Sequence, residues 1–85
     1  MLLHVTGVTR TDVDIRPLIP AEQEALRALR EAGVVQQSYI RADHAGGYFI
    51  VEAESIEAAR QHMATLPFVE QGIMTTEYAE LIPPS

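Results

Sequence analysis

Two stretches of this chain carry apolar residues at helical spacing, and each lies between segments with the composition of β-strands. The helical stretches cover residues 20–32 and 55–66, the strand-like segments cover residues 2–8, 34–42, 48–53 and 73–82, and residues 9–17 have the composition of a loop. The order βαββαβ is that of the ferredoxin-like arrangement, in which both helices cover one face of a four-stranded antiparallel sheet. We therefore predict a single α+β domain over residues 1–85.

The ends of the predicted helices are marked by residues with a defined physical role. Pro20 suits the first turn of a helix, and Gly33 suits the position after its last turn. The hydroxyl of Ser55 can cap the second helix, and Pro67 is expected to end it. The sequence Asp-His-Ala-Gly-Gly at residues 43–47 predicts the turn of a hairpin.

The third predicted strand is apolar or aromatic on both of its faces. Phe49 and Val51 lie on one face, and Tyr48 and Ile50 lie on the other. A chain of 85 residues buries only about 60–65% of its unfolded surface. An uncovered sheet face of this composition would be a large exposed patch. We therefore expect a homodimer, or a larger homo-oligomer built from dimers, in which two sheets face each other.

The charge and composition exclude several classes of function. The net charge is −6, and the six arginines are scattered among twelve carboxylates, so nucleic acid is not an expected partner. The absence of Lys excludes Schiff-base catalysis and a P-loop, and the absence of Cys excludes thiolate chemistry. The first residues have neither a basic segment nor a long apolar core. We expect no membrane partner and a cytoplasmic location.

Several sequence segments resemble the muconolactone Δ-isomerase family. They are the start MLLHVTGVT, the stretch GVVQQSYIRADHAGGYFIVEAESIEAARQHMATLPF and the ending LIPPS. The opening His4-Val5 pair, the spacing from Gly33 to Tyr48 around His44 and the Leu66-Pro67 stop all fall in register with that family. The resemblance covers nearly the whole chain, apart from a shorter approach to the first helix that lacks the isomerase's lysines.

This resemblance implies a dimeric α+β barrel. It also implies an enzyme that, without a cofactor, moves a double bond in a small lactone carrying a carboxylate, a step in the bacterial breakdown of aromatic compounds. The same barrel hosts polyketide cyclases, monooxygenases and dehalogenases, because a fold does not fix the chemistry of its site. The chain departs from the family at Tyr39, where the isomerase has Trp, and at residues 45–47, which replace a bulkier turn.

A proton shift of this kind needs a base, and Glu22 is the first candidate. It lies four residues before Leu26 and seven before Leu29, so it shares their apolar stripe and should point toward the sheet. The resemblance places a glutamate of the family on the same helix. The alternative is an acid in the first turn that is favoured only by the helix dipole. Glu52, on the third strand, is a rival base or a substrate contact, and the alternative is that it is merely solvated at an exposed strand end.

Two histidines are candidates for proton transfer. His4 and Thr6 share a strand face, opposite Leu3 and Val5. If their face lines the barrel, His4 can relay a proton or hold an oxyanion, and Thr6 can contact the substrate. His4 could equally be a buried structural residue. The resemblance includes His44, in the hairpin turn, where surface histidines are also common.

Arg41 is the expected partner of a substrate carboxylate, because a guanidinium can hold one with two hydrogen bonds. The alternative is a simple ion pair with Asp43. Tyr39 and Tyr48 can add phenol donors, although half-buried tyrosines are common in strands.

Two classes of function remain open. One is a cofactor-free isomerase, or a cyclase or monooxygenase of the same superfamily. The other is a barrel that binds a small molecule or a partner without catalysis. The three histidines lack ligand spacing, so no metal site is expected.

Overall fold

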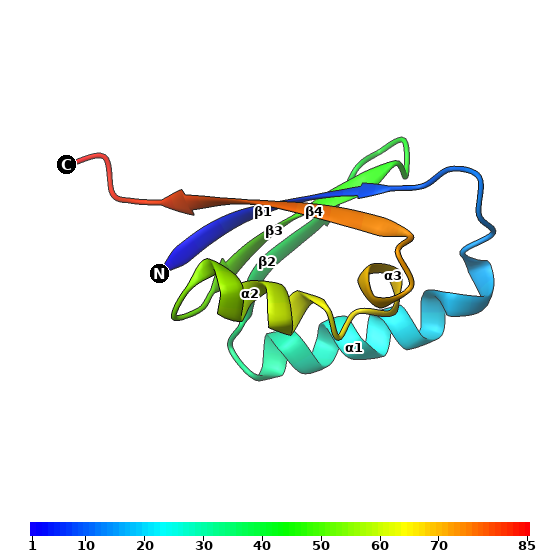
Figure 1. The fold of residues 1–85 in the computed structure, drawn as a ribbon, viewed down its shortest axis with the longest axis horizontal. Coiled ribbons are helices and arrows are strands. Elements are labelled where there is room, and N and C mark those ends of the chain that lie inside the picture. The colour runs from blue at the N-terminus through cyan, green and yellow to red at the C-terminus, as the bar shows by residue number, and fades with distance from the viewer.

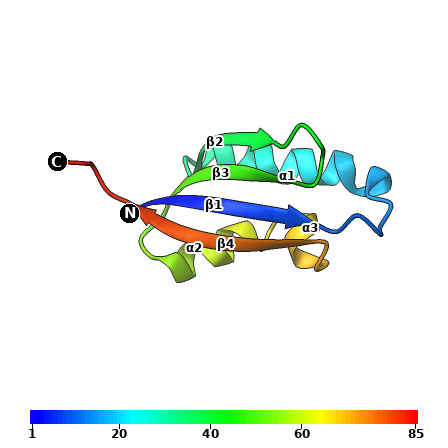
Figure 2. The ribbon, with the colours of Figure 1, turned by 90° about the horizontal axis from the view of Figure 1, so that it is seen from above.

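The computed structural model describes residues 1–85 and has the predicted α+β fold. Its strands are β1 (Leu2–Thr9), β2 (Val35–Ile40), β3 (Gly46–Glu52) and β4 (Met74–Leu81), and its helical segments are η1 (Arg16–Leu18), α1 (Ile19–Glu31), α2 (Ile56–Met63) and α3 (Pro67–Glu70). The strands form one antiparallel sheet in the order β2-β3-β1-β4. All helices lie on one side of it (Figure 1), with α1 behind β2 and β3 and with α2 and α3 behind β4 (Figure 2).

Two local predictions about the helices need correction. The loop before α1 is not irregular throughout, because Arg16–Leu18 form the 3₁₀ turn η1. The second helix was predicted to run to Leu66 and to be ended by Pro67, but α2 ends at Met63. Pro67 instead begins α3, because Leu66 is extended and proline, which lacks an N–H, suits the first position of a new helix. The cap of α2 is as predicted, with Ser55 Oγ accepting a hydrogen bond from the Ala58 N–H at 3.0 Å.

The register of the strands separates the two sheet faces as predicted. Val5 pairs with Phe49 and is fully buried under the helices. His4 pairs with Ile50 on the opposite face, which no element of this chain covers. We call these two surfaces the covered face and the open face. The prediction that Phe49 and Val51 lie on one face of β3, and Tyr48 and Ile50 on the other, is therefore confirmed.

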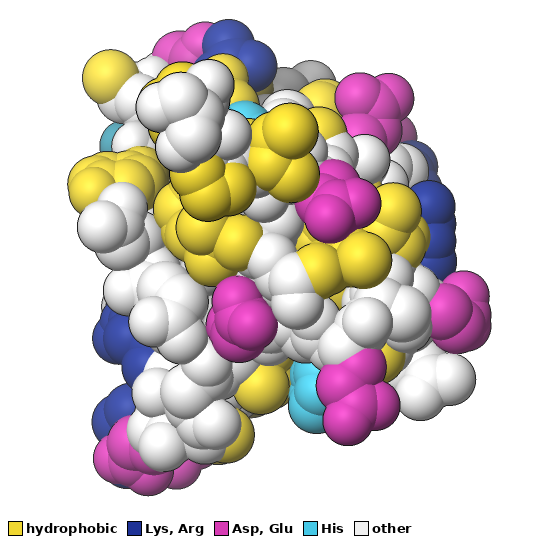
Figure 3. Space-filling model, turned by 90° about the vertical axis from the view of Figure 1, so that its left-hand side faces the viewer, with side chains coloured by type: hydrophobic (Ala, Val, Ile, Leu, Met, Phe, Trp, Pro, Cys, Tyr) yellow, Lys and Arg dark blue, Asp and Glu magenta, His cyan; other side chains and the backbone are white.

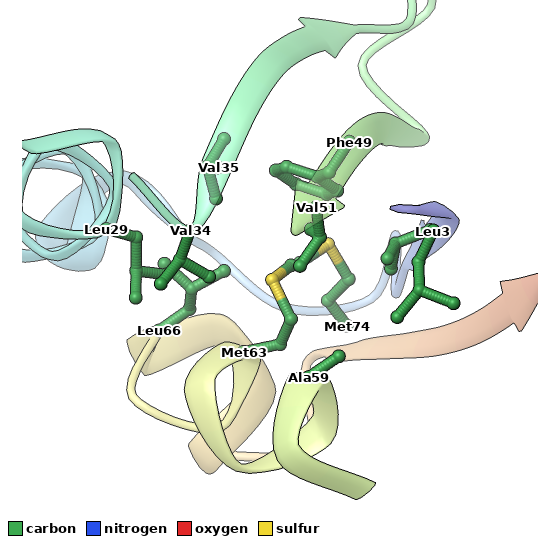
Figure 4. Close-up of a cluster of buried hydrophobic side chains, with 11 residues drawn as sticks. Leu3, Leu29, Val34, Val35, Phe49, Val51, Ala59, Met63, Leu66 and Met74 are labelled. Atoms are coloured by element: carbon green, nitrogen blue, oxygen red, sulfur yellow. The ribbon is translucent and has the colours of Figure 1, made fainter. Parts of the chain in front are cut away.

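The core lies between the covered face and the helices. Eleven buried hydrophobic residues form one cluster, in which the strands contribute mainly branched side chains and α2 contributes Ala59 and Met63. Figure 4 shows Met63 and Leu66 directed toward the sheet from the segment that carries α2 and α3. Both are fully buried. The longest helix, α1, has 13 residues, and no helix has the length and hydropathy needed to cross a membrane.

One irregularity determines which side chains of β2 reach the covered face. The pairing of β2 with β3 shifts between Val35 and Gln37, so that Gln36 is an extra residue in the strand. After this bulge, Ser38 pairs with Phe49 and shares its face, whereas Tyr39 pairs with Tyr48 on the open face. Simple alternation from Val35 would have placed these two side chains the other way round.

Candidate active site

A cavity of about 620 Å³ lies between α1 and the covered face. This volume is within the range of sites for small molecules. Half of its sixteen lining residues are hydrophobic. The lining comes from the loop before α1, from α1 itself, from β2, β3 and the turn between them, from α3, and from the adjacent ends of β1 and β4. The cavity is thus formed by one chain, is partly open to solvent and does not depend on the open face.

Close backbone contact shapes the floor of the cavity. Gly46 and Gly47 line it at the start of β3. A Cβ atom on Gly46 would collide with the carbonyl oxygen of Gly7, and one on Gly47 would lie 2.6 Å from the carbonyl oxygen of Tyr39. Glycine is therefore required at both positions, and it leaves the space above the strands open.

Glu22 lies on the wall of the cavity, as its position on the stripe predicted. Its carboxyl group is half-buried, and Oε1 accepts a hydrogen bond from the backbone N–H of Phe68 at 3.0 Å. Burial raises the pKa of this carboxyl above its ordinary value of 4.5, and the Phe68 N–H opposes the rise. A carboxylate with a raised pKa in a mostly apolar cavity is suited to proton transfer.

Of the two candidate histidines, only His44 lines the cavity. It is exposed in the turn between β2 and β3, where it has a left-handed backbone with a φ of 60°. Its N–H donates to the carbonyl oxygen of Arg41 at 2.9 Å. A positive φ is uncommon for a residue other than glycine, and such positions often lie at functional sites.

The other candidates from β1 and β3 lie on the open face. His4 packs its ring against Tyr48, with 5.6 Å between the ring centroids, and Thr6 pairs with Tyr48 on the same face. Glu52 is exposed and lies 3.4 Å from the amino group of Met1. The sheet therefore separates these four residues from Glu22.

Two further candidates are not placed for the predicted contacts. Arg41 lies outside the cavity and pairs with Asp43 at 2.6 Å, which is the alternative considered for it. Tyr39 borders the cavity, but its hydroxyl lies 3.3 Å from Gln37 Oε1 on the open face. Arg41 therefore does not line the cavity of this chain.

The cavity also contains polar residues that the sequence analysis did not single out. These are Thr9, Gln23, Arg30 and Ser38. Arg30 was detectable, because it lies eight residues after Glu22 on the stripe that includes Leu26. Ser38 was not, because its face is set by the bulge at Gln36. The His, Asp and Glu side chains form no group of three that could hold a metal ion.

The chain matches no protein-family model, and no curated protein matches it. Among solved structures, it is similar to a muconolactone isomerase, with 26% identity, a TM-score of 0.79 and coverage of 100% of this chain and 93% of the other. It is also similar to 5-chloro-2-hydroxyhydroquinone dehydrochlorinase from Burkholderia phenoliruptrix AC1100, in complex with 2,5-dihydroxybenzoquinone, with 19% identity, a TM-score of 0.73 and coverage of 96% and 94%.

A third similar structure is that of an antibiotic biosynthesis monooxygenase, with 16% identity, a TM-score of 0.61 and coverage of 98% of this chain and 100% of the other. The two structures below 25% identity support the fold alone. Together the three place the fold within the α+β barrel superfamily of muconolactone isomerase, without assigning the chain to one family in it. Two of these neighbours, the isomerase and the dehydrochlorinase, are enzymes.

Proposed function

We propose that this protein is an isomerase that shifts a proton, and with it a double bond, in a small enolisable ring such as an unsaturated lactone. The observation that carries the proposal is the half-buried carboxyl group of Glu22, with its raised pKa, on the wall of a cavity of suitable size. The similarity to muconolactone isomerase, at 26% identity over the whole chain, supports the same type of reaction.

The reaction uses side chains that already line the cavity. The carboxylate of Glu22 removes a proton from a carbon conjugated to the substrate carbonyl, and the electrons move into a dienolate. A hydrogen-bond donor must hold the negative oxygen, and the amide of Gln23 is available one residue from the base. Glu22 then returns the proton to the distant carbon of the dienolate, which moves the double bond and restores the carboxylate.

The test of the base is Glu22→Gln, which keeps the shape of the side chain and removes its basicity. Turnover of muconolactone should fall by about 10²- to 10⁴-fold, the usual contribution of a general base. Glu24→Gln is the matched control, since Glu24 lies on the same helix, exposed and outside the cavity. Its turnover should stay within about threefold, the range expected for a substitution remote from the site.

Two rival bases lie on the open face and are tested in the same assay. Glu52→Gln and His4→Ala should each leave turnover within severalfold, because the sheet separates them from the cavity. If either abolishes turnover while Glu22→Gln does not, the base acts at the open face. A protein that binds the lactone but neither isomerises it nor exchanges its protons with D₂O would instead be a non-catalytic binding barrel, which the largely apolar lining also suits.

We also propose that the open face forms a homodimer. Five large apolar or aromatic side chains on it are between 38% and 60% exposed: Leu2, Val8, Tyr39, Tyr48 and Leu81. Figure 3 views the end of the molecule that carries both termini and shows hydrophobic side chains gathered in its upper half, with carboxylates among them. A stable dimer would bury more than about 1,000 Å² in total. The cytoplasmic location stays a prediction.

A further inference from the structure

Arg30 differs from the other arginines because its guanidinium has no strong partner. Four arginines form ion pairs, namely Arg10 with Asp12, Arg16 with Asp14, Arg27 with Glu24 and Glu31, and Arg41 with Asp43. The guanidinium of Arg60 lies over the ring of Tyr78, 4.6 Å from its centroid. Arg30 has only a long contact, in which Nη2 lies 3.4 Å from Ser38 Oγ. It is also the only cationic side chain that lines the cavity.

Arg30 and Glu22 face the cavity from opposite ends of one helix stripe. They are eight residues apart, which corresponds to about 12 Å along the axis of α1. Leu26 lies between them on the helix, and Phe49 lines the cavity from the sheet. The cavity is thus polar at two ends, with a base at one and a cation at the other, and apolar between them.

Ser38 gives the cationic end a second polar group. Its hydroxyl accepts from Arg30, so its own O–H is free to donate. The bulge at Gln36 is what places Ser38 on the covered face, opposite α1. The guanidinium and the hydroxyl therefore come from the helix and from the sheet, and they can hold one anion between them.

We propose that Arg30 and Ser38 form the subsite that holds a substrate carboxylate, and that Arg30 is the residue that distinguishes an anionic ring from a neutral one. This inference rests on the proposed isomerase function and names a residue that determines its specificity. The helix dipole disfavours an anion near the last turn of α1, where Arg30 lies, by less than a charge-assisted hydrogen bond gains. Because the chain carries a net charge of −6, an anion needs such a local cation.

The test compares muconolactone as its free carboxylate with its neutral methyl ester. Arg30→Met keeps most of the side-chain length and removes the charge. It should lower kcat/KM for the acid by about 10- to 100-fold, the range for a lost charged hydrogen bond. The ester should change by less than about twofold, the range for an exposed substitution. Arg30→Lys should have a kcat/KM for the acid between those of the parent and Arg30→Met, because an ammonium keeps the charge but cannot form two parallel hydrogen bonds to a carboxylate.

Arg27→Met is the matched control, because Arg27 lies on the same helix, outside the cavity. It should leave both substrates unchanged. Glu22→Gln should lower turnover of acid and ester alike, which separates loss of the base from loss of the subsite. If Arg30→Met lowers acid and ester equally, or lowers neither, the carboxylate subsite is overturned.

The subsite can also be tested where the protein turns over neither compound. Acid and ester are then titrated into ¹⁵N-labelled protein, and their Kd values are compared by NMR. Binding of the acid at least about tenfold more tightly, with the preference lost in Arg30→Met, supports the subsite while the isomerase function fails. No preference for the acid in the parent protein overturns the subsite itself.

Discussion

The covered and open faces of the sheet are built from alternating residues of the same strands, yet they have different chemistry. On β1, Leu3 and Val5 are fully buried beneath the helices, while His4 and Thr6 are partly exposed on the other side. The cavity and the carboxyl group with a raised pKa both belong to the covered face. The open face has stacked rings and exposed apolar side chains.

Residue type alone does not distinguish the two faces. Both faces contain residues that suit catalysis, including a histidine, a threonine and a tyrosine on the open one. On the covered face the chain partly removes a carboxyl group from water, and this desolvation raises the pKa of Glu22. The open face would reach a comparable state only if a second copy covered it.

The sharpest test of the two faces uses the neighbouring leucines of β1. Leu3 is fully buried, so Leu3→Ala should lower the free energy of unfolding by about 3 kcal/mol. Leu2 is 39% exposed, and Leu2→Ala should cost the monomer less than about 0.5 kcal/mol. Urea denaturation at low protein concentration measures both. Equal costs would contradict the assignment of Leu2 to the open face.

A charge on the open face should separate the proposed dimer. Ile50 lies at the centre of this face, between His4 and Gln37 on the neighbouring strands. Ile50→Asp should raise the dimer Kd by about 100-fold, since burying an unpaired carboxylate is costly. Sedimentation velocity at micromolar concentration gives the mass. A parent protein that sediments only at 9.4 kDa would refute the dimer.

The smallest effect concerns the pH dependence of stability. Because the pKa of Glu22 is raised in the folded state, ionisation of this carboxyl opposes folding. The stability that the protonated carboxyl contributes is fully present below the ordinary pKa of about 4.5 and is lost as pH rises through the folded-state pKa. The stability of the parent relative to Glu22→Gln should therefore fall over this window, by less than about 1 kcal/mol because the group is half-exposed. Urea denaturation of both proteins from pH 4 to 7 measures the difference.

Glu24→Gln serves as the control of opposite sign. The Arg27 side chain lowers the pKa of Glu24. The stability that the ionised Glu24 contributes is therefore present above its ordinary pKa and is lost as pH falls through its folded-state pKa. If the stability of the parent relative to Glu22→Gln and its stability relative to Glu24→Gln change in the same direction with pH, the environment assigned to Glu22 is wrong.

Most of the fold followed from patterns that depend on neighbouring residues alone. The order of elements, the cap at Ser55, the position of Glu22 on its stripe and the two faces of β3 were all predicted. Each rests on a helical or strand period, or on a local hydrogen bond. The predicted role of Pro67 was wrong, because α2 already ends at Met63 and the proline begins α3, a position that suits it as well as a helix end does.

The site was harder to predict because it depends on contacts across the fold. One extra residue at Gln36 reverses the faces of Ser38 and Tyr39, and no pattern in β2 signals it. Arg41 has the right chemistry for a carboxylate, but Asp43, two residues away, already occupies it. Arg30 is left without an acidic partner by the arrangement of the whole surface, which a reading of one segment does not reveal.

The hydrogen bond from Phe68 to Glu22 joins α3 to α1 through the proposed base itself. A charged carboxylate is a stronger acceptor than a protonated acid, so this contact weakens whenever Glu22 carries a substrate proton. The wall of the cavity at α3 would then be held less tightly in the middle of the catalytic cycle than at its start. Protection of the Phe68 amide against hydrogen exchange, measured relative to the intrinsic exchange rate at each pH, should therefore be lower in acid than at neutral pH. This one backbone amide would then report the protonation state of Glu22.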